Sequence, residues 1–266
     1  MTGASSTVEA CCASLYGHPI VELIAGQSYH PGGLGSTRRL LDAAGLSAGT
    51  RILDAGCGLG ASARLAALEF GLAVDACDVS GVAVRRAKEL ADAGGATVHF
   101  VEASVLQLPF RDGRFGGVLA ECVLSTTSKR AALAELRRVT APGGALLVTD
   151  VTASDDLGAS GPLAEVLCVT GAWRPGEVED LVASSGFEIV RAWDETAGIT
   201  ALLDRVEARI GLLTTLSRDL AAGRIWGLAF NTDSRRAGAA LRDARQLVAS
   251  GRIGYRAVIA RAAPAG

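Results

Sequence analysis

The fold is decided by the stretch Ile52-Leu53-Asp54-Ala55-Gly56-Cys57-Gly58-Leu59-Gly60. Its apolar start is typical of a buried β-strand. The three glycines that follow predict a tight turn, because glycine adopts positive φ without steric cost and lets the backbone approach a ligand closely. A helix is expected to begin near Ala61, with its N–H groups and positive dipole end directed at the turn. The stretch therefore predicts a strand, a glycine turn and a ligand-binding helix N-terminus.

An acidic residue, Asp78, ends the next apolar run, about 20 residues after the turn, where a carboxylate accepts hydrogen bonds from both hydroxyls of a ribose. Asp54 lies inside the first strand, where its charge repels a pyrophosphate and attracts a cationic group. Residues 56–61 also match the loose dinucleotide pattern G-x-G-x-x-A, which alone is weak evidence. The predicted ligand is therefore adenosine-like and cationic, which argues against a nicotinamide enzyme.

Two further segments extend this pattern. Residues 108–115 read Leu-Pro-Phe-Arg-Asp-Gly-Arg-Phe, residues 136–144 read Leu-Arg-Arg-Val-Thr-Ala-Pro-Gly-Gly, and each segment precedes an apolar strand. Together with the glycine turn and Asp78, they resemble the class I S-adenosylmethionine-dependent methyltransferases over residues 50–195. The resemblance implies S-adenosylmethionine as cofactor, and it implies a cofactor site formed by Asp54, Gly56, Cys57, Gly58, Gly60, Asp78, Val79, Ser104, Val105 and Glu121. Family members often carry an Asp where Ser104 stands, and a serine accepts a weaker hydrogen bond from the adenine amino group.

Apolar and amphipathic segments alternate from residue 51 onward, which predicts a parallel sheet with helices on both faces and a ligand at the carboxyl ends of the strands. The expected strands are 51–55, 72–77, 97–101, 116–121, 144–151, 187–193 and 254–260, and the expected helices are 60–70, 80–93, 129–139, 175–185, 199–222 and 235–249. The fold class is thus α/β, a doubly wound, seven-stranded Rossmann-like methyltransferase sheet.

Three regions are expected along the chain. Residues 1–48 form an N-terminal helical cap, with helices at 9–25 and 36–44 and Ser36 as the N-cap of the second. Residues 49–196 form the S-adenosylmethionine-binding core. Residues 197–266 hold a helical insertion and the final strand that completes the sheet. We interpret the insertion as a lid or as the surface of a homodimer.

Composition narrows the classes of partner. The chain has 266 residues, 49% of them hydrophobic, with a net charge of −2 and no basic stripe, which argues against nucleic acid. No run approaches the ~18 apolar residues of a membrane span. The first ten residues lack a secretion-signal pattern, so a cytoplasmic location is expected. The six cysteines would then be reduced, and Cys57 and Cys77 are expected to pack as small apolar residues.

Cysteines also define a narrower resemblance. Residues 121–125 (Glu-Cys-Val-Leu-Ser) follow the fourth strand, residues 165–173 follow the fifth, and Cys11-Cys12 and Tyr16-Gly17 lie near the N-terminus. In that order they are similar to the arsenite methyltransferases, which hold trivalent arsenic with cysteines from three such places. The resemblance implies that Cys122 and Cys168, with either Cys11 or Cys12, are catalytic metalloid ligands, because soft thiolates suit a thiophilic centre. The order of the N-terminal segments and the helical insertion depart from that group.

Two other functions stay open. In the first, Cys122 and Cys168 only pack, and the methyl acceptor is an O, N or C atom of a small organic molecule. In the second, the chain is a non-catalytic binder of an adenosine ligand, which the complete set of donor-site residues argues against. The segment His30-Pro31-Gly32-Gly33 has two interpretations. Either Gly33 binds the methionine carboxylate while His30 orders the cap or acts as a base, or the segment is a turn between helices.

Overall fold

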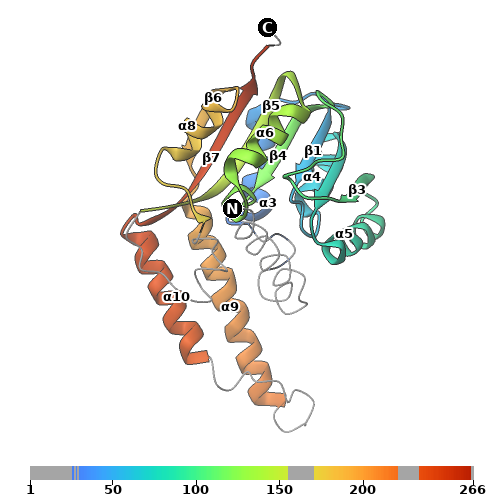
Figure 1. The fold of residues 1–266 in the computed structure, drawn as a ribbon. Helices are drawn as coiled ribbons and strands as arrows, with labels where there is room; N and C mark the ends of the chain where they lie inside the picture. Colours follow the sequence, from blue (N-terminus) through green and yellow to red (C-terminus); the bar gives the residue numbers. More distant parts are fainter. Residues whose placement is uncertain (1–25, 27, 29, 155–170, 221–233, 265–266) are drawn as a thin grey trace.

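The computed structural model describes residues 26, 28, 30–154, 171–220 and 234–264 (Figure 1). Within these ranges a seven-stranded sheet has the strand order β3-β2-β1-β4-β5-β7-β6. Helices cover both faces of this sheet (Figure 1). The predicted α/β fold with a seven-stranded Rossmann-like methyltransferase sheet is therefore confirmed.

Five strands form the parallel part of the sheet. They are β1 (Arg51–Ala55), β2 (Ala73–Asp78), β3 (Val98–Glu102), β4 (Phe115–Glu121) and β5 (Thr140–Ala153). Each agrees with a predicted strand within two residues at either end, apart from the start of β5, which begins at Thr140 because that residue pairs with Phe115 ahead of a bulge. The carboxyl ends of β1, β2 and β4 therefore meet at one edge of the sheet.

Two antiparallel strands complete the sheet. They are β6 (Phe187–Asp194) and β7 (Ile253–Ala262). The last strand of the chain, β7, lies between β5 and β6 and pairs with both along its length. The predicted final strand thus completes the sheet from an internal place.

The helices divide between two hydrophobic cores. On one face, α3 (Gly33–Ala44), α4 (Ala61–Phe70) and α5 (Gly81–Ala93) contribute buried residues such as Leu40, Leu65 and Val84. On the other face, α6 (Lys129–Val139) and α8 (Glu177–Ser184) contribute residues such as Leu133 and Val182. This two-sided burial explains why the central strands read as continuous apolar runs.

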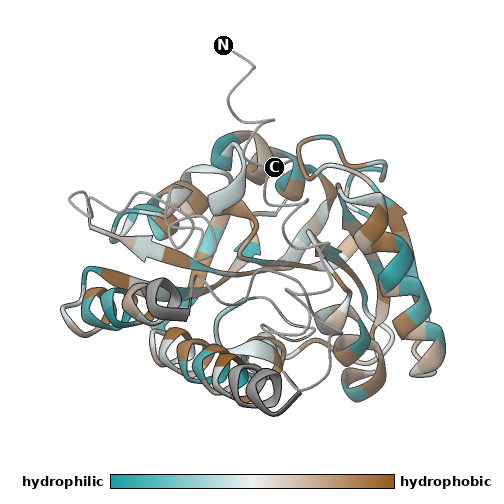
Figure 2. Cartoon of the chain, turned by 90° about the horizontal axis from the view of Figure 1, so that it is seen from below, coloured by the Kyte–Doolittle hydropathy of each residue, from teal (hydrophilic) through white to brown (hydrophobic). Residues whose placement is uncertain are grey.

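A helical hairpin of α9 (Ala197–Leu220) and α10 (Ser234–Ala249) extends away from the sheet (Figure 1). At its base, Ile199 and Leu203 of α9 and Leu241 of α10 pack with Tyr255 of β7 in a third, smaller cluster. Seen end-on in Figure 2, both helices carry hydrophilic as well as hydrophobic residues. None of the helices in the described ranges combines the length and apolar character needed to cross a bilayer.

The start of α3 differs from the prediction. Ser36 is not the N-cap, because the helix already begins at Gly33 and its N-cap is Gly32, with φ of 81°. The Ser36 N–H donates to the Gly32 carbonyl oxygen at 3.4 Å, as expected of a residue inside the first turn. Gly32 adopts a left-handed conformation that residues with a side chain rarely adopt. The helix can therefore begin at Gly33, three residues before the predicted cap. The helix expected at 9–25 lies outside the described residues.

Candidate active site

The glycine turn joins β1 to α4 at the carboxyl edge of the sheet. Gly56, Gly58 and Gly60 all have positive φ, at 73°, 51° and 68°. The N–H groups of Gly56 and Cys57 both donate to the carbonyl oxygen of Cys77 at 2.8 Å, which ties the turn to β2. The Cys57 thiol donates to the Gly58 carbonyl oxygen at 3.8 Å, and burial raises its pKa well above the ordinary value.

Two of these glycines are also required by the packing of the chain on itself. A Cβ atom on Gly56 would lie 2.4 Å from Cγ2 of Val123, and one on Gly60 would lie 2.7 Å from Cε1 of Phe100. Real Cβ atoms do not approach other atoms so closely, so a larger residue at either place would displace core side chains. The sequence interpretation ascribed these glycines to a tight turn and to ligand approach, and the structure adds this packing reason.

Asp78 fastens the turn to the start of α5. Its Oδ2 accepts a hydrogen bond from Gly58 N at 2.8 Å, and its Oδ1 accepts one from Ser80 N at 2.9 Å. Burial raises the pKa of the Asp78 carboxyl. A carboxylate has about four lone-pair sites, so both oxygens retain capacity for a further donor such as a ribose hydroxyl.

Asp54 is the least satisfied acidic group of the site. The residue is 3% exposed, and its Oδ2 has no hydrogen-bond partner among the described residues. Burial raises the pKa of its carboxyl well above the ordinary value, and the charges of Glu121 and Asp78 raise it further, while a hydrogen bond with the Ala63 backbone lowers it. A buried acceptor without a donor is unfavourable, so this place fits a ligand group that is cationic or donates hydrogen bonds.

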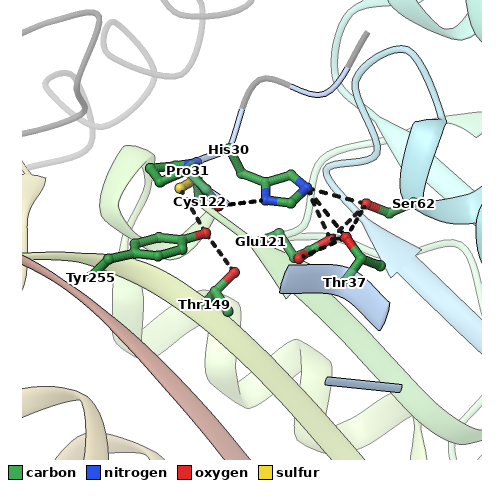
Figure 3. A network of polar contacts seen from close by, with 8 residues as sticks. All are labelled: His30, Pro31, Thr37, Ser62, Glu121, Cys122, Thr149 and Tyr255. Carbon is green, nitrogen blue, oxygen red and sulfur yellow. Dashed lines mark hydrogen bonds and ion pairs between the residues drawn. The ribbon is translucent and has the colours of Figure 1, made fainter. Parts of the chain in front are cut away.

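Glu121 ends β4 inside a buried polar cluster (Figure 3). Its Oε2 accepts hydrogen bonds from Thr37 Oγ1 at 3.0 Å and from Ser62 Oγ at 2.6 Å. Thr37 lies in α3 and Ser62 in the first turn of α4, so three elements converge on one carboxylate. The sequence interpretation missed both hydroxyls. Their one sequence signal is a small polar residue on the buried face of a helix.

His30 joins this cluster from the loop before α3. Its Nε2 lies 3.4 Å from Glu121 Oε2, and its Nδ1 lies 3.1 Å from the carbonyl oxygen of Pro31. Both ring nitrogens therefore face protein acceptors (Figure 3). This geometry favours the ordering role over the role of a base. Gly33, at the N-terminus of α3, lies next to the same segment.

Cys122 follows Glu121 in an unusual backbone conformation. Its φ is 55°, and it is the one non-glycine residue with positive φ in the described ranges. Its thiol donates to Tyr255 Oη at 3.6 Å, and that hydroxyl donates to Thr149 Oγ1 at 2.7 Å. Burial raises the pKa of the Cys122 thiol well above the ordinary value, with Asp150 and Glu121 adding to the rise. The thiol is therefore held as a buried hydrogen-bond donor to Tyr255.

The other expected site residues divide as follows. Ser104 Oγ accepts from Leu106 N at 3.1 Å in the loop after β3, and Val105 beside it is buried in the core. Val79 is exposed after β2, and Cys77 is fully buried, as the packing interpretation predicts. The metalloid set of Cys11, Cys12 and Cys168 lies outside the described residues. Within those residues, no three His, Cys, Asp or Glu side chains are grouped as metal ligands.

Comparisons with known proteins agree with this geometry. Residues 52–144 match the family model described as a methyltransferase domain. The chain is 38% identical over 112 residues to the 2-methyl-6-phytyl-1,4-hydroquinone methyltransferase of Synechocystis sp., which covers 42% of this chain and 35% of that protein. It is 35% identical over 119 residues to the uncharacterized methyltransferase YodH of Bacillus subtilis, covering 44% and 50%. The chain thus spans about half, or less, of the length of these curated relatives.

Solved structures show the same fold. A phosphoethanolamine N-methyltransferase 2 of Haemonchus contortus, in complex with S-adenosyl-L-methionine, has a TM-score of 0.73 at 19% identity, covering 92% of this chain and 56% of that one. The [4+2]-cyclase SpnF has a TM-score of 0.67 at 24% identity, covering 87% and 81%. The family model identifies residues 52–144 as a methyltransferase domain, and the solved structures show the same fold.

Proposed function

We propose that this chain, with its class I S-adenosylmethionine-dependent methyltransferase domain, is an enzyme that methylates an O, N or C atom of a small organic molecule. The observation that carries the proposal is the buried Asp54 carboxylate oxygen without a partner, beside Glu121 and Asp78 at the carboxyl ends of the strands. Such a site lacks positive charge, and a ligand with an ammonium and a sulfonium group supplies it. The match of residues 52–144 to a methyltransferase domain supports the same assignment.

The described residues have distinct roles in this proposal. The bound cofactor supplies an activated methyl group. Asp78 binds the ribose hydroxyls, while its bonds to Gly58 and Ser80 hold the glycine turn in shape. Asp54 pairs with the cofactor's amino group, whereas the N–H of Gly33 is already donated to the carbonyl oxygen of His30 at 3.2 Å. Methyl transfer needs alignment and exclusion of water more than it needs an acid or base, so a dedicated catalytic base is not required.

The organic acceptor is favoured over trivalent arsenic for two reasons. The relative from Synechocystis sp. is by its name a methyltransferase of a hydroquinone, which is a small organic molecule. The Cys122 thiol donates a hydrogen bond to Tyr255 Oη and is buried, which fits a packing residue. Tyr255 and Cys122, whose backbone has positive φ, instead pack against each other next to Glu121.

The test measures binding first and turnover second. Calorimetry with S-adenosylmethionine should give micromolar affinity, with weaker binding in Asp54→Asn and unchanged binding in the matched surface variant Asp92→Asn, on the exposed face of α5. Mass spectrometry then follows S-adenosylhomocysteine and methylated product with a hydroquinone, a primary amine, or arsenite plus a thiol as acceptor. A folded protein that binds no S-adenosylmethionine contradicts the function, and methylated arsenic without any organic product contradicts the acceptor class.

A further inference from the structure

The two buried carboxylates Glu121 and Asp54 differ in their hydrogen-bond donors. Glu121 accepts from the hydroxyls of both Thr37 and Ser62, at 3.0 and 2.6 Å. Both hydroxyls also lie 3.3–3.5 Å from one another or from His30 Nε2, so Glu121 sits within a connected polar cluster. Asp54 has one stabilising hydrogen bond, from the Ala63 backbone, and its buried Oδ2 has no partner among the described residues. Glu121 therefore has two side-chain donors within reach, whereas Asp54 has a single backbone donor.

Like charges in a buried site resist simultaneous ionisation. Burial, then Glu121, then Asp78 all raise the pKa of Asp54, so the three carboxylates are electrostatically linked. Asp78 has two backbone N–H donors, from Gly58 and Ser80. Among the three acids, Asp54 is thus the one whose ionised form is least stabilised.

Two thiols are the titratable neighbours of Asp54 in the turn and in β2. Cys57, in the turn, and Cys77, in β2, are both linked electrostatically to Asp54. Burial raises the pKa of both thiols, that of Cys77 to about 12, so both are neutral near pH 7. His30, from the loop before α3, contacts Glu121 and is the other titratable group of the cluster.

We propose that Asp54 holds a proton in the ligand-free protein and releases it when the cofactor's ammonium group binds, so that the site exchanges one proton for one cation. The O–H bond of the carboxylic acid breaks, the proton passes to solvent, and the carboxylate pairs with an ammonium group that keeps its three protons. Thr37 and Ser62 are positioning residues, because they act through Glu121 as its hydrogen-bond donors. This inference rests on the proposed function, since it needs a ligand with a cationic amino group.

The exchange is measured by calorimetry with S-adenosylhomocysteine, which has the amino group and is not consumed. Titrations from pH 5 to 8 are made in two buffers with different ionisation enthalpies, and the difference in binding enthalpy counts the protons released. We expect release that approaches one proton. The dissociation constant should fall by up to tenfold per pH unit while free Asp54 is protonated, and it should level off above that range. Adenosine, which lacks the amino acid part, should bind without proton release.

Variants assign the proton to a residue. Asp54→Asn should bind S-adenosylhomocysteine without proton release and with a flat pH profile. His30→Gln should release protons as the parent does, which excludes His30 as the source. The double change Thr37→Val and Ser62→Ala should move the pH-dependent range upward, because the carboxyl cluster then loses two hydrogen-bond donors. The single variant Thr37→Ser keeps a hydroxyl and should show the same pH profile as the parent protein. A purely structural role of Thr37 would not require this result.

The outcomes separate this inference from the proposed function. A folded protein that binds neither S-adenosylmethionine nor S-adenosylhomocysteine overturns the function itself. Binding with a buffer-independent enthalpy and a flat pH profile overturns only the proton exchange. Release that persists in a folded Asp54→Asn also overturns it. Should Asp54→Asn fail to fold, the contrast between S-adenosylhomocysteine and adenosine in the parent protein, with His30→Gln beside it, still decides the matter.

Discussion

The parallel strands β1 to β4 and the antiparallel strands β6 and β7 belong to one sheet, but Asp54 in the first group and the polar side chains of the second differ in their hydrogen-bond partners. In the parallel half, one oxygen of the buried Asp54 has no partner within the part of the chain that the structure describes. In the antiparallel half, the Tyr255 hydroxyl has Thr149 as partner, and Glu195 accepts from Trp193 Nε1 at 2.6 Å. The parallel half falls within the residues that match the methyltransferase domain. Unpaired buried atoms also occur elsewhere, for example Glu179 Oε2 on α8, so what distinguishes Asp54 is its place at the carboxyl ends of the parallel strands, where a ligand is expected.

The largest effect is expected from two glycine substitutions, one in each half. Gly56→Ala should destabilise the protein by about 2–5 kcal/mol, because it combines positive φ with overpacking against Val123. Gly251→Ala, between α10 and β7, should cost only about 1–2 kcal/mol, because its φ is 70° and nothing lies within 4 Å of the added Cβ. Urea unfolding measures both. Equal losses would mean that the turn at Gly56 is no more constrained than a surface turn.

A second pair compares aspartates in the same local motif. Asp78 accepts from Ser80 N, two residues on, and Asp194 at the end of β6 accepts from Thr196 N in the same way. Asp78→Ala should weaken S-adenosylmethionine binding by tens-fold or more, because charge-assisted hydrogen bonds of about 1.5–3 kcal/mol each are lost. Asp194→Ala should leave calorimetric affinity unchanged. A similar loss in both variants would contradict the ribose role of Asp78.

Opposite pH dependences should distinguish Asp54 from Glu195. The pKa of Asp54 is higher in the folded protein than in the unfolded chain. The contribution of Asp54 to the free energy of unfolding is therefore fully present below its unfolded-state pKa, and it is lost as pH rises through its folded-state pKa. The hydrogen bond from Arg39 lowers the pKa of Glu195 in the folded protein. The contribution of Glu195 to the free energy of unfolding is therefore present above its unfolded-state pKa, and it is lost as pH falls through its folded-state pKa. Without ligand at pH 8, Asp54→Asn should therefore stabilise by about 1–2 kcal/mol.

Glu195→Gln should change stability in the other direction, with a loss of about 1 kcal/mol at pH 7 that vanishes towards pH 3. Denaturant titrations at several pH values measure both variants. The comparison fails if Asp54→Asn is destabilising throughout the range.

The smallest effect is expected at Tyr255. Tyr255→Phe removes the donor to Thr149 Oγ1 and the acceptor of the Cys122 thiol. Its loss should cost about 1 kcal/mol in unfolding free energy without changing cofactor affinity, because neither partner belongs to the cofactor site. Thermal unfolding and calorimetry check the two statements. A clear loss of affinity would extend the cofactor site into the antiparallel half.

Much of the fold followed from the sequence because the strands are long apolar runs with glycine or acidic residues at their ends. Parallel strands bring those ends to one edge, which is why Asp54, Asp78 and Glu121 were expected together. The N-cap of α3 was predicted wrongly, because a serine is a common cap and the pattern does not reveal that Gly32 takes positive φ.

Other parts of the site depend on tertiary packing. Thr37 and Ser62 are separated from Glu121 by 84 and 59 residues, so no local spacing connects them with the carboxylate. The Cys122 thiol contacts the hydroxyl of Tyr255 on β7, which lies 133 residues later in the chain. Hydroxyl side chains occur throughout helices and strands, and the elements must be assembled before their partners are evident.

The internal place of β7 has a consequence for the order in which the chain folds. During synthesis β1 to β5 leave the ribosome first, and they make up the parallel part of the sheet. The strands β5 and β6 can pair with β7 only after that last strand has been synthesised. Until then, each exposes a strand edge that other chains can join. The helices α9 and α10 contact each other, and this hairpin connects the end of β6 with the start of β7. The hairpin thereby shortens the search that closes the sheet.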